Sequence, residues 1–291
     1  MELLLGGADP FLKRLKAAAE RGDGEAASQL GTMYYSGCQV FEDRDEAERW
    51  FILAAEHGCY YMPLILYESL QENSPEEAVR WLRIPADQGD PLSCRILGMR
   101  YYHGAGVEQD QARAARLFRT AAEQGDTESA SYLSGMYLKG IGVEQNFVEA
   151  AKLCRAAAEQ GDAPSAYNYA LLLHHGRGLS QSIPAAIKWY RIAAQKGHAQ
   201  SAFHLAQIYE AGEGVERDRA ASVRWLKTAA ELGHTRSALI LGLVYHLAHG
   251  VQRDDRAAEQ YLRQAAQGGE PEAETLLQEF GFEPLASNQD N

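Results

Sequence analysis

The chain has 291 residues, of which 46% are hydrophobic, and this length and composition suit a protein with a packed core. Forty acidic residues outnumber 28 basic ones, and the formal net charge of -12 repels phosphate backbones and anionic lipid surfaces, which argues against nucleic acid as a partner. No stretch approaches the roughly 18 consecutive apolar residues that a membrane-spanning helix needs.

A glycine recurs along the chain at a nearly constant interval, which allows the sequence to be aligned with itself. It stands at Gly22, Gly58, Gly89, Gly125, Gly161, Gly197, Gly233 and Gly269. Every interval is 36 residues except the 31 residues between Gly58 and Gly89. Self-similarity at a fixed period of this length is typical of a repeat protein. We define the offset of a residue as its distance in sequence from the preceding member of this glycine series.

The first half of each unit has the pattern of an amphipathic helix. Small residues, Leu and Tyr recur at offsets 5, 8, 9 and 12, as in Leu97-Gly98 and Tyr101, and these positions fall within about 100° on a helical wheel. We expect this face to be buried. A Gly-x-Gly-Val sequence follows in three of the units, as at residues 104–107, and a glycine there can adopt the left-handed conformation that ends a helix.

The second half of each unit predicts another helix. Offset 21 holds a residue whose side chain can accept a hydrogen bond from the first turn, namely Asp43, Asp110, Asn146, Ser182, Asp218 or Asp254. Alanine follows at offset 25, and large side chains recur at offsets 28 and 29, as in Trp50-Phe51 and Trp189-Tyr190. Each unit therefore predicts two helices that approach closely at small residues and fill the remaining space with large ones.

In chain order we expect an N-terminal extension (1–9), a solenoid over residues 10–280 and a disordered tail (281–291). The solenoid begins with a single capping helix near residues 10–21, continues with units that start near 22, 58, 89, 125, 161, 197 and 233, and ends with a capping helix over 272–280. The second unit lacks the Gly-x-Gly-Val turn, and Ser74 and Pro75 suit the start of its second helix. Pro85 predicts a local break in curvature there. This irregular unit is either the result of drift or a specialised contact.

Taken together, these residues resemble the Sel1-like repeats, relatives of the tetratricopeptide repeats, over roughly residues 10 to 279. The resemblance implies an all-α fold: a right-handed α/α solenoid of about seven 36-residue helix-turn-helix repeats with terminal capping helices. It also implies that the first helices line a concave surface. Some exported members of the family form a disulfide in each unit through a cysteine at the second position of an Ala-Ala pair, and that position is alanine throughout this chain.

The positions that face away from the predicted core are the candidates for binding. Offsets 3, 6, 10, 13 and 14 lie on average about 140° from the core stripe. They are rich in aromatic residues, Met, His and Arg, which is typical of binding hot spots rather than of a solvated face. The predicted partner-binding residues are Tyr61, Arg95, Met99, Tyr102, His103, Tyr167, His174, Phe203, Gln207, Glu210, Arg236 and His246. The alternative is that such residues pack against the neighbouring unit, and for Leu92, Leu171 and Leu243 both interpretations stand equally.

Nothing in the sequence predicts catalysis, a cofactor or a metal site. The Gly-x-Gly turns do not extend to a dinucleotide-binding or Walker pattern, and His174 and His175 point about 100° apart on a helix. Cys94 and Cys154 replace core residues and are expected to be buried, whereas a disulfide between Cys38 and Cys59 remains an alternative to free thiols. We therefore expect no enzyme.

The function expected from the resemblance and from this surface is protein–protein interaction, as a scaffold or adaptor that binds a partner on its concave face. The alternative is an immunity protein that neutralises a cognate secreted toxin, such as a phospholipase effector of type VI secretion. We expect a protein partner and a monomeric chain. The N-terminus lacks the basic segment and apolar run of a secretory signal, so we expect a cytoplasmic protein, or a periplasmic one if a signal has been removed.

Overall fold

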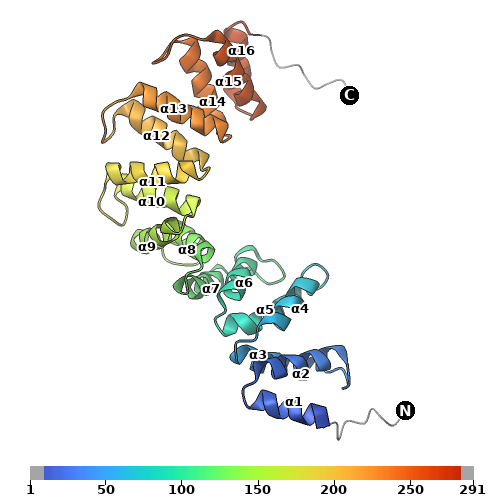
Figure 1. Cartoon of the computed structure of the whole chain (residues 1–291). Helices are drawn as coiled ribbons and strands as arrows, with labels where there is room; N and C mark the ends of the chain where they lie inside the picture. Colours follow the sequence, from blue (N-terminus) through green and yellow to red (C-terminus); the bar gives the residue numbers. More distant parts are fainter. Residues whose placement is uncertain (1–9, 283–291) are drawn as a thin grey trace, which may run out of the picture. The chain divides into compact units, whose positions relative to one another are not determined.

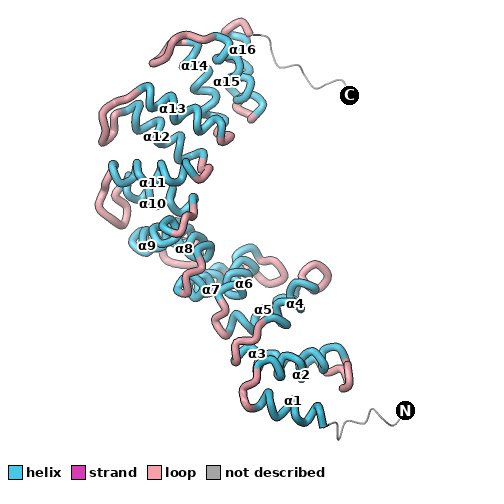
Figure 2. Tube along the Cα trace, in the orientation of Figure 1, coloured by secondary structure: helices cyan, strands magenta, loops and turns pink. Residues whose placement is uncertain are grey.

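The computed structural model of the chain describes residues 10–282, and within that range it contains sixteen helices and no strand (Figure 2). The expected all-α solenoid fold is confirmed. The helices group into two compact halves of several repeats each, which we call unit 1 (Met1–Gln145) and unit 2 (Asn146–Asn291). From here on, a single 36-residue unit of the sequence is called a repeat. None of the helices in the described range is both long and apolar enough to cross a membrane.

In unit 1, first and second helices alternate along the chain (Figure 1). The helices are α1 (Pro10–Glu20), α2 (Gly24–Ser36), α3 (Arg44–Glu56), α4 (Tyr61–Leu70), α5 (Pro75–Asp87), α6 (Pro91–His103), α7 (Gln111–Glu123) and α8 (Thr127–Lys139). The even-numbered helices are the predicted first helices, and α3, α5 and α7 are the predicted second helices.

Unit 2 continues the same alternation. Its helices are α9 (Phe147–Glu159), α10 (Ala163–His175), α11 (Ile183–Gln195), α12 (Ala199–Ala211), α13 (Arg219–Glu231), α14 (Thr235–His246), α15 (Asp255–Gln267) and α16 (Pro271–Glu279). Here too the even-numbered helices are first helices. The single helices α1 and α16 lie where the sequence predicts caps.

The predicted core and the predicted helix starts are both observed. Leu97 and Phe118 of one hairpin are buried, as are Leu205 and Tyr190 in unit 2. The six residues at offset 21 all occupy the N-cap of a second helix, and all but Ser182 accept a backbone hydrogen bond through the side chain. Local capping and the burial of one helix face therefore define the hairpin.

The irregular second repeat keeps both of its helices. Its first helix, α4, has ten residues, and α5 begins at Pro75 after Ser74, which forms no capping bond through its side chain. Pro85 lies in the last turn of α5 and does not interrupt the helix. A proline lacks the N–H group that would bond four residues back, so α5 continues past Pro85 with one backbone hydrogen bond fewer.

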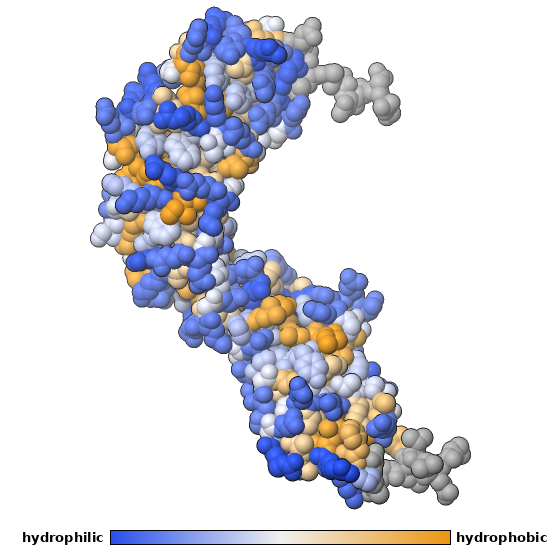
Figure 3. Space-filling view, viewed as in Figure 1, coloured by the Kyte–Doolittle hydropathy of each residue, from blue (hydrophilic) through white to orange (hydrophobic). Residues whose placement is uncertain are grey.

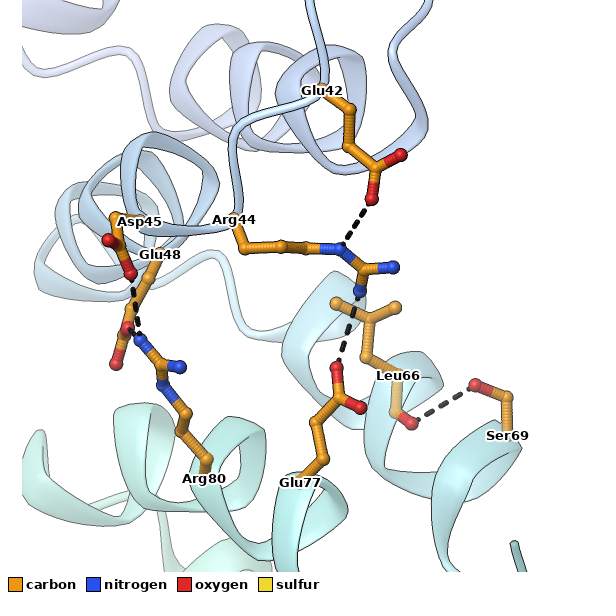
Figure 4. A network of polar contacts seen from close by, with 8 residues as sticks. All are labelled: Glu42, Arg44, Asp45, Glu48, Leu66, Ser69, Glu77 and Arg80. Atoms are coloured by element: carbon orange, nitrogen blue, oxygen red, sulfur yellow. Dashed lines mark hydrogen bonds and ion pairs between the residues drawn. The ribbon is translucent and has the colours of Figure 1, made fainter. Parts of the chain in front are cut away.

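Ion pairs join α5, the second helix of this repeat, to α3, the second helix of the preceding repeat (Figure 4). Arg44 of α3 lies 3.3 Å from Glu77 of α5. Arg80 of α5 pairs with Asp45, at 3.3 Å, and with Glu48, both on α3. All of these side chains are partly exposed, so each pair contributes at most about 1 kcal/mol. They supplement the core in which Phe51 and Trp81 pack edge to face.

The C-terminal packing extends two residues beyond the expected limit of the solenoid. Phe280 stacks on His246 with a centroid separation of 3.7 Å, and Phe282 packs edge-on against both rings. The predicted tail therefore begins no earlier than residue 283. The N-terminal extension (1–9) and the rest of the predicted tail lie outside the described residues.

Candidate protein-binding surface

Unit 1 exposes large apolar side chains on successive first helices. Tyr61 and Ile65 of α4 are 47% and 50% exposed, Leu92 of α6 is 42% exposed, and Tyr132 of α8 is 37% exposed. They stand at offsets 3 and 7, which are about 40° apart on a helix. We call these four residues the first-helix face of unit 1. Figure 3 shows hydrophobic side chains gathered on the surface around α4 and α6.

Next to this face is a shallow pocket of about 260 Å³ between α6 and α8. Tyr102 and Tyr132 line it together with Lys139. The ring of Tyr132 stacks on buried Phe118 with a centroid separation of 5.2 Å. The ring centroid of Tyr102 lies 6.4 Å from that of Tyr132. Rings held in this way lose little conformational entropy on binding, which favours them as anchors for a partner.

The predicted residues of unit 1 divide into exposed side chains and contacts between repeats. Tyr61 and His103 are exposed, and Met99 and Tyr102 are half-buried. Arg95 lies 3.3 Å from Asp126, the N-cap of α8, and also pairs with Glu128 of that helix. Arg95 therefore links two repeats within the unit.

Two predicted aromatic residues of unit 2 lie between neighbouring repeats. Tyr167 of α10 packs against Tyr190 of α11, and its hydroxyl lies 3.2 Å from His204 Nε2 of α12. Phe203 of α12 stacks on His234, the N-cap of α14, at 4.5 Å. Both aromatic residues are half-buried, so only part of each ring is accessible to a partner.

The remaining predicted residues of unit 2 are mostly engaged in polar contacts. Gln207 is the one exposed residue among them that forms no hydrogen bond or ion pair within residues 10–282. The contacts are His174 with Glu213 (3.0 Å), Glu210 with Arg217 (2.5 Å) and Arg219 (3.4 Å), Arg236 with Glu270 (3.6 Å) and Glu272 (3.3 Å), and His246 with Asp255 (2.9 Å). Each of these predicted residues is therefore positioned by a neighbour before any partner arrives.

Offset 6 of the first helices, which the helical wheel places away from the core, is occupied by contacts between repeats. At offset 6, Ser28 and Leu239 are fully buried, and Arg95, Tyr167 and Phe203 all contact the following repeat. The wheel locates the face that packs within one hairpin, but a first helix also contacts the first helix of the next repeat. Offset 7 is the more exposed position in unit 1. Ile65 and Tyr132 were missed for this reason, although their closeness to offset 3 on the wheel could have revealed them.

Histidines form a connected group in unit 2. His198 and His234 occupy the N-caps of α12 and α14, where they accept hydrogen bonds from the amides of Ser201 and Ser237 through Nδ1. Burial lowers the pKa of both, and burial together with the neighbouring histidines lowers the pKa of His204 to about 4. These three rings are neutral at pH 7, since a neutral ring is the form that burial favours.

Two of the four cysteines, Cys94 and Cys154, are buried as the sequence predicts. Burial raises the pKa of the Cys94 thiol to about 11, which suppresses the reactive thiolate. Cys38 and Cys59 are free thiols, so the alternative of a disulfide between them is not observed. Across residues 10–282, no three His, Cys, Asp or Glu side chains are placed to hold a metal ion.

The repeat geometry and the sequence period agree with one known family. The family model described as Sel1 repeat matches seven segments, at residues 24–59, 65–90, 91–126, 127–162, 163–198, 199–234 and 235–270. The chain belongs to the Sel1 repeat family. Sel1 repeat proteins are generally protein-interaction modules. The Sel1 match also includes the short second repeat, although residues 60–64 at its start lie outside the matched segments.

Solved structures support the same Sel1 fold. A protective antigen of uropathogenic Escherichia coli with an SLR fold is 28% identical and has a TM-score of 0.71; the match covers 97% of this chain and 62% of that protein. A Sel1 repeat protein from Oxalobacter formigenes is 27% identical, with a TM-score of 0.67, over 95% of this chain and 83% of that one. This Sel1 chain thus spans less than two thirds of the E. coli protein.

Proposed function

We propose that this Sel1 repeat protein binds a partner protein through the first-helix face of unit 1 and acts as a scaffold or adaptor. The observation that carries the proposal is the exposure of Tyr61, Ile65, Leu92 and Tyr132 on successive first helices. Single exposed apolar residues are ordinary on any protein surface, but four of them at two neighbouring offsets of three successive first helices favour an interface. The aromatic anchors Tyr61 and Tyr132 would provide most of the binding energy.

The electrostatics of the chain support a protein partner over a nucleic acid. The net charge of -12 repels a phosphate backbone, and this repulsion is strongest at low ionic strength, where salt does not screen it. The same charge accelerates encounter with a basic protein surface. The face itself is apolar, so we expect charge to guide association and the apolar anchors to determine the dissociation rate.

The experiment begins with a tagged full-length chain, whose co-purifying protein is identified by mass spectrometry and then produced separately. Its dissociation constant is measured for the wild type and for the double variant Tyr61→Ala, Leu92→Ala. We expect binding at least about tenfold weaker in the double variant, since each truncation removes an exposed anchor. Both residues are exposed, so circular dichroism should show an unchanged helical fold.

The matched control is Phe41→Ala, which removes an apolar ring that is 72% exposed in the loop between α2 and α3 of the same unit. Its binding should equal that of the wild type. Equal loss in the control, or none in the double variant, would contradict the assignment of the surface. Recovery of several unrelated proteins supports a scaffold, whereas one stoichiometric enzyme that is inactive while bound would replace that role with an inhibitor.

A further inference from the structure

A repeated contact joins a basic residue of one second helix to a tyrosine of the next first helix, 18 residues later. Arg83 donates to the hydroxyl of Tyr101 at 3.0 Å, and Arg119 donates to that of Tyr137 at 2.7 Å. In unit 2 the corresponding pair is Arg191 and Tyr209, at 3.3 Å. Because it recurs in both units, the contact itself is structural.

Tyr101 differs from the other tyrosines because a second guanidinium also donates to its hydroxyl. Arg113 of α7 donates to that oxygen at 3.0 Å, in addition to the bond from Arg83 of α5. Two like charges that share one neutral acceptor repel each other. The carboxylate of Asp110 is 3.9 Å from Arg113 Nε and already caps α7 through the Arg113 amide, so it compensates the pair only in part.

A third arginine extends this basic group. Arg116 follows Arg113 on α7, and the only acidic residue of that helix is Glu123 at its last position. Neither Arg83 nor Arg116 forms an ion pair with any carboxylate in the described part of the chain. Arg83 and Arg116 therefore add positive charge beside Arg113 that no nearby ion pair offsets.

The three arginines border a groove of about 360 Å³ between α5, α6 and α7. Its lining consists of Arg83, Asp87, Leu97, Tyr101, Arg113, Arg116, Leu117 and Thr120. Asp87 is the single acid in this lining, whereas a neighbouring hollow that shares Arg83, Tyr101 and Arg113 is also lined by Glu76, Glu108 and Asp110. Of these two hollows, only the groove has more basic than acidic residues in its lining.

We propose that this groove binds a carboxylate group from an acidic segment of a partner protein. The planar fork of a guanidinium matches a carboxylate, and Arg116 has no ion-pair partner among the described residues, while Arg83 and Arg113 remain bonded to Tyr101. A carboxylate fits better than a phosphate, because Asp87 in the same lining opposes a group that carries two negative charges at one point, whereas a peptide spreads its charges over separate side chains. The groove includes no residue of the first-helix face, so it does not depend on the function proposed for that face.

The test uses the full-length chain and a tetraglutamate peptide with an acetylated N-terminus and an amidated C-terminus. Calorimetric titration at low salt should give saturable binding with one peptide per chain, and binding should weaken as salt is added. Arg116→Gln should weaken it about threefold to fivefold, as expected for a partly exposed charge pair. This variant leaves both bonds to Tyr101 in place, so the fold is kept.

The matched control is Arg119→Gln, which removes an arginine from the same helix that donates to Tyr137 and lies outside the groove lining. Its affinity for the peptide should equal that of the wild type. The proposal is overturned if tetraglutamine binds equally well, if Arg119→Gln has the same effect as Arg116→Gln, or if no saturable binding occurs. Displacement of the peptide by inorganic phosphate at an equal concentration would overturn the preference for a carboxylate.

Discussion

At the scale of single residues, the closeness of two helices in a repeat depends on one missing methyl group. Gly31 of α2 is buried against the ring of Phe51 of α3, and a Cβ atom at position 31 would lie 2.5 Å from that ring. The ring is fully buried and cannot move aside without displacing its own neighbours. Gly31 therefore determines how closely the first hairpin packs.

We expect Gly31→Ala to lower the free energy of unfolding by about 1 to 3 kcal/mol, the usual cost of overpacking a core. Chemical denaturation followed by circular dichroism measures this change. Gly135→Ala is the matched control, because it lies inside a first helix of the same unit with no atom within 4 Å of the added methyl. There the gain in helix propensity should stabilise the protein by roughly 0.5 to 1 kcal/mol. Equal effects of the two substitutions would refute the packing argument.

At the scale of helices, the N-caps vary in a way that matters for pH. Asp90 and Asp126 cap the first helices α6 and α8 in unit 1, whereas His198 and His234 cap α12 and α14 in unit 2. A histidine can accept the capping bond only while its Nδ1 is unprotonated. Protonation would remove the acceptor and place a positive charge at the positive end of the helix dipole.

We expect the stability of unit 2 to fall as the pH falls below about 6.5. The pKa values of His198, His204 and His234 lie below the ordinary value of 6.5, so the unfolded chain binds more protons than the folded one. Their contribution is complete above pH 6.5 and declines toward the folded pKa, which for His204 is about 4. Urea unfolding at several pH values between 7.5 and 5 measures the decline.

The variant His198→Asp, His234→Asp isolates the capping histidines from the carboxylates that also titrate in acid. Aspartate retains the capping acceptor and stays ionised over this range, so the loss of stability between pH 7.5 and 5 should shrink by about 1 kcal/mol. His204 is unchanged in this variant and would still contribute. Identical pH dependence of the wild type and the variant would exclude the caps as the origin.

The sequence predicts individual helices better than it predicts contacts between repeats. Capping residues such as Asp110 and the core position of Leu97 follow from local rules, because a helix start and a buried stripe are properties of one helix or hairpin. The contacts of Arg95 with Asp126 and of Phe203 with His234 join different repeats. A helical wheel drawn for a single helix does not contain that information. It therefore assigned to a partner some residues that contact the next repeat instead.

At the scale of the whole molecule, the period of 36 residues was enough to predict the repeat architecture, because every level of the pattern agrees with it. The candidate surface was only partly predictable. Tyr61 was identified from its offset, but Tyr132 and the groove beside Arg113 depend on how neighbouring repeats meet. Binding in a repeat protein therefore has to be located from the accessible side chains of the assembled unit, beyond the repeat pattern itself.

The central claim is that a partner protein contacts the first-helix face of unit 1, and site-specific photocrosslinking tests it most directly. The photoreactive substitution Tyr132→p-benzoylphenylalanine is compared with Phe41→p-benzoylphenylalanine, each irradiated in the presence of the purified partner. We predict a covalent adduct with the partner from position 132 and none from position 41. An adduct from position 41 with none from position 132 would contradict the claim.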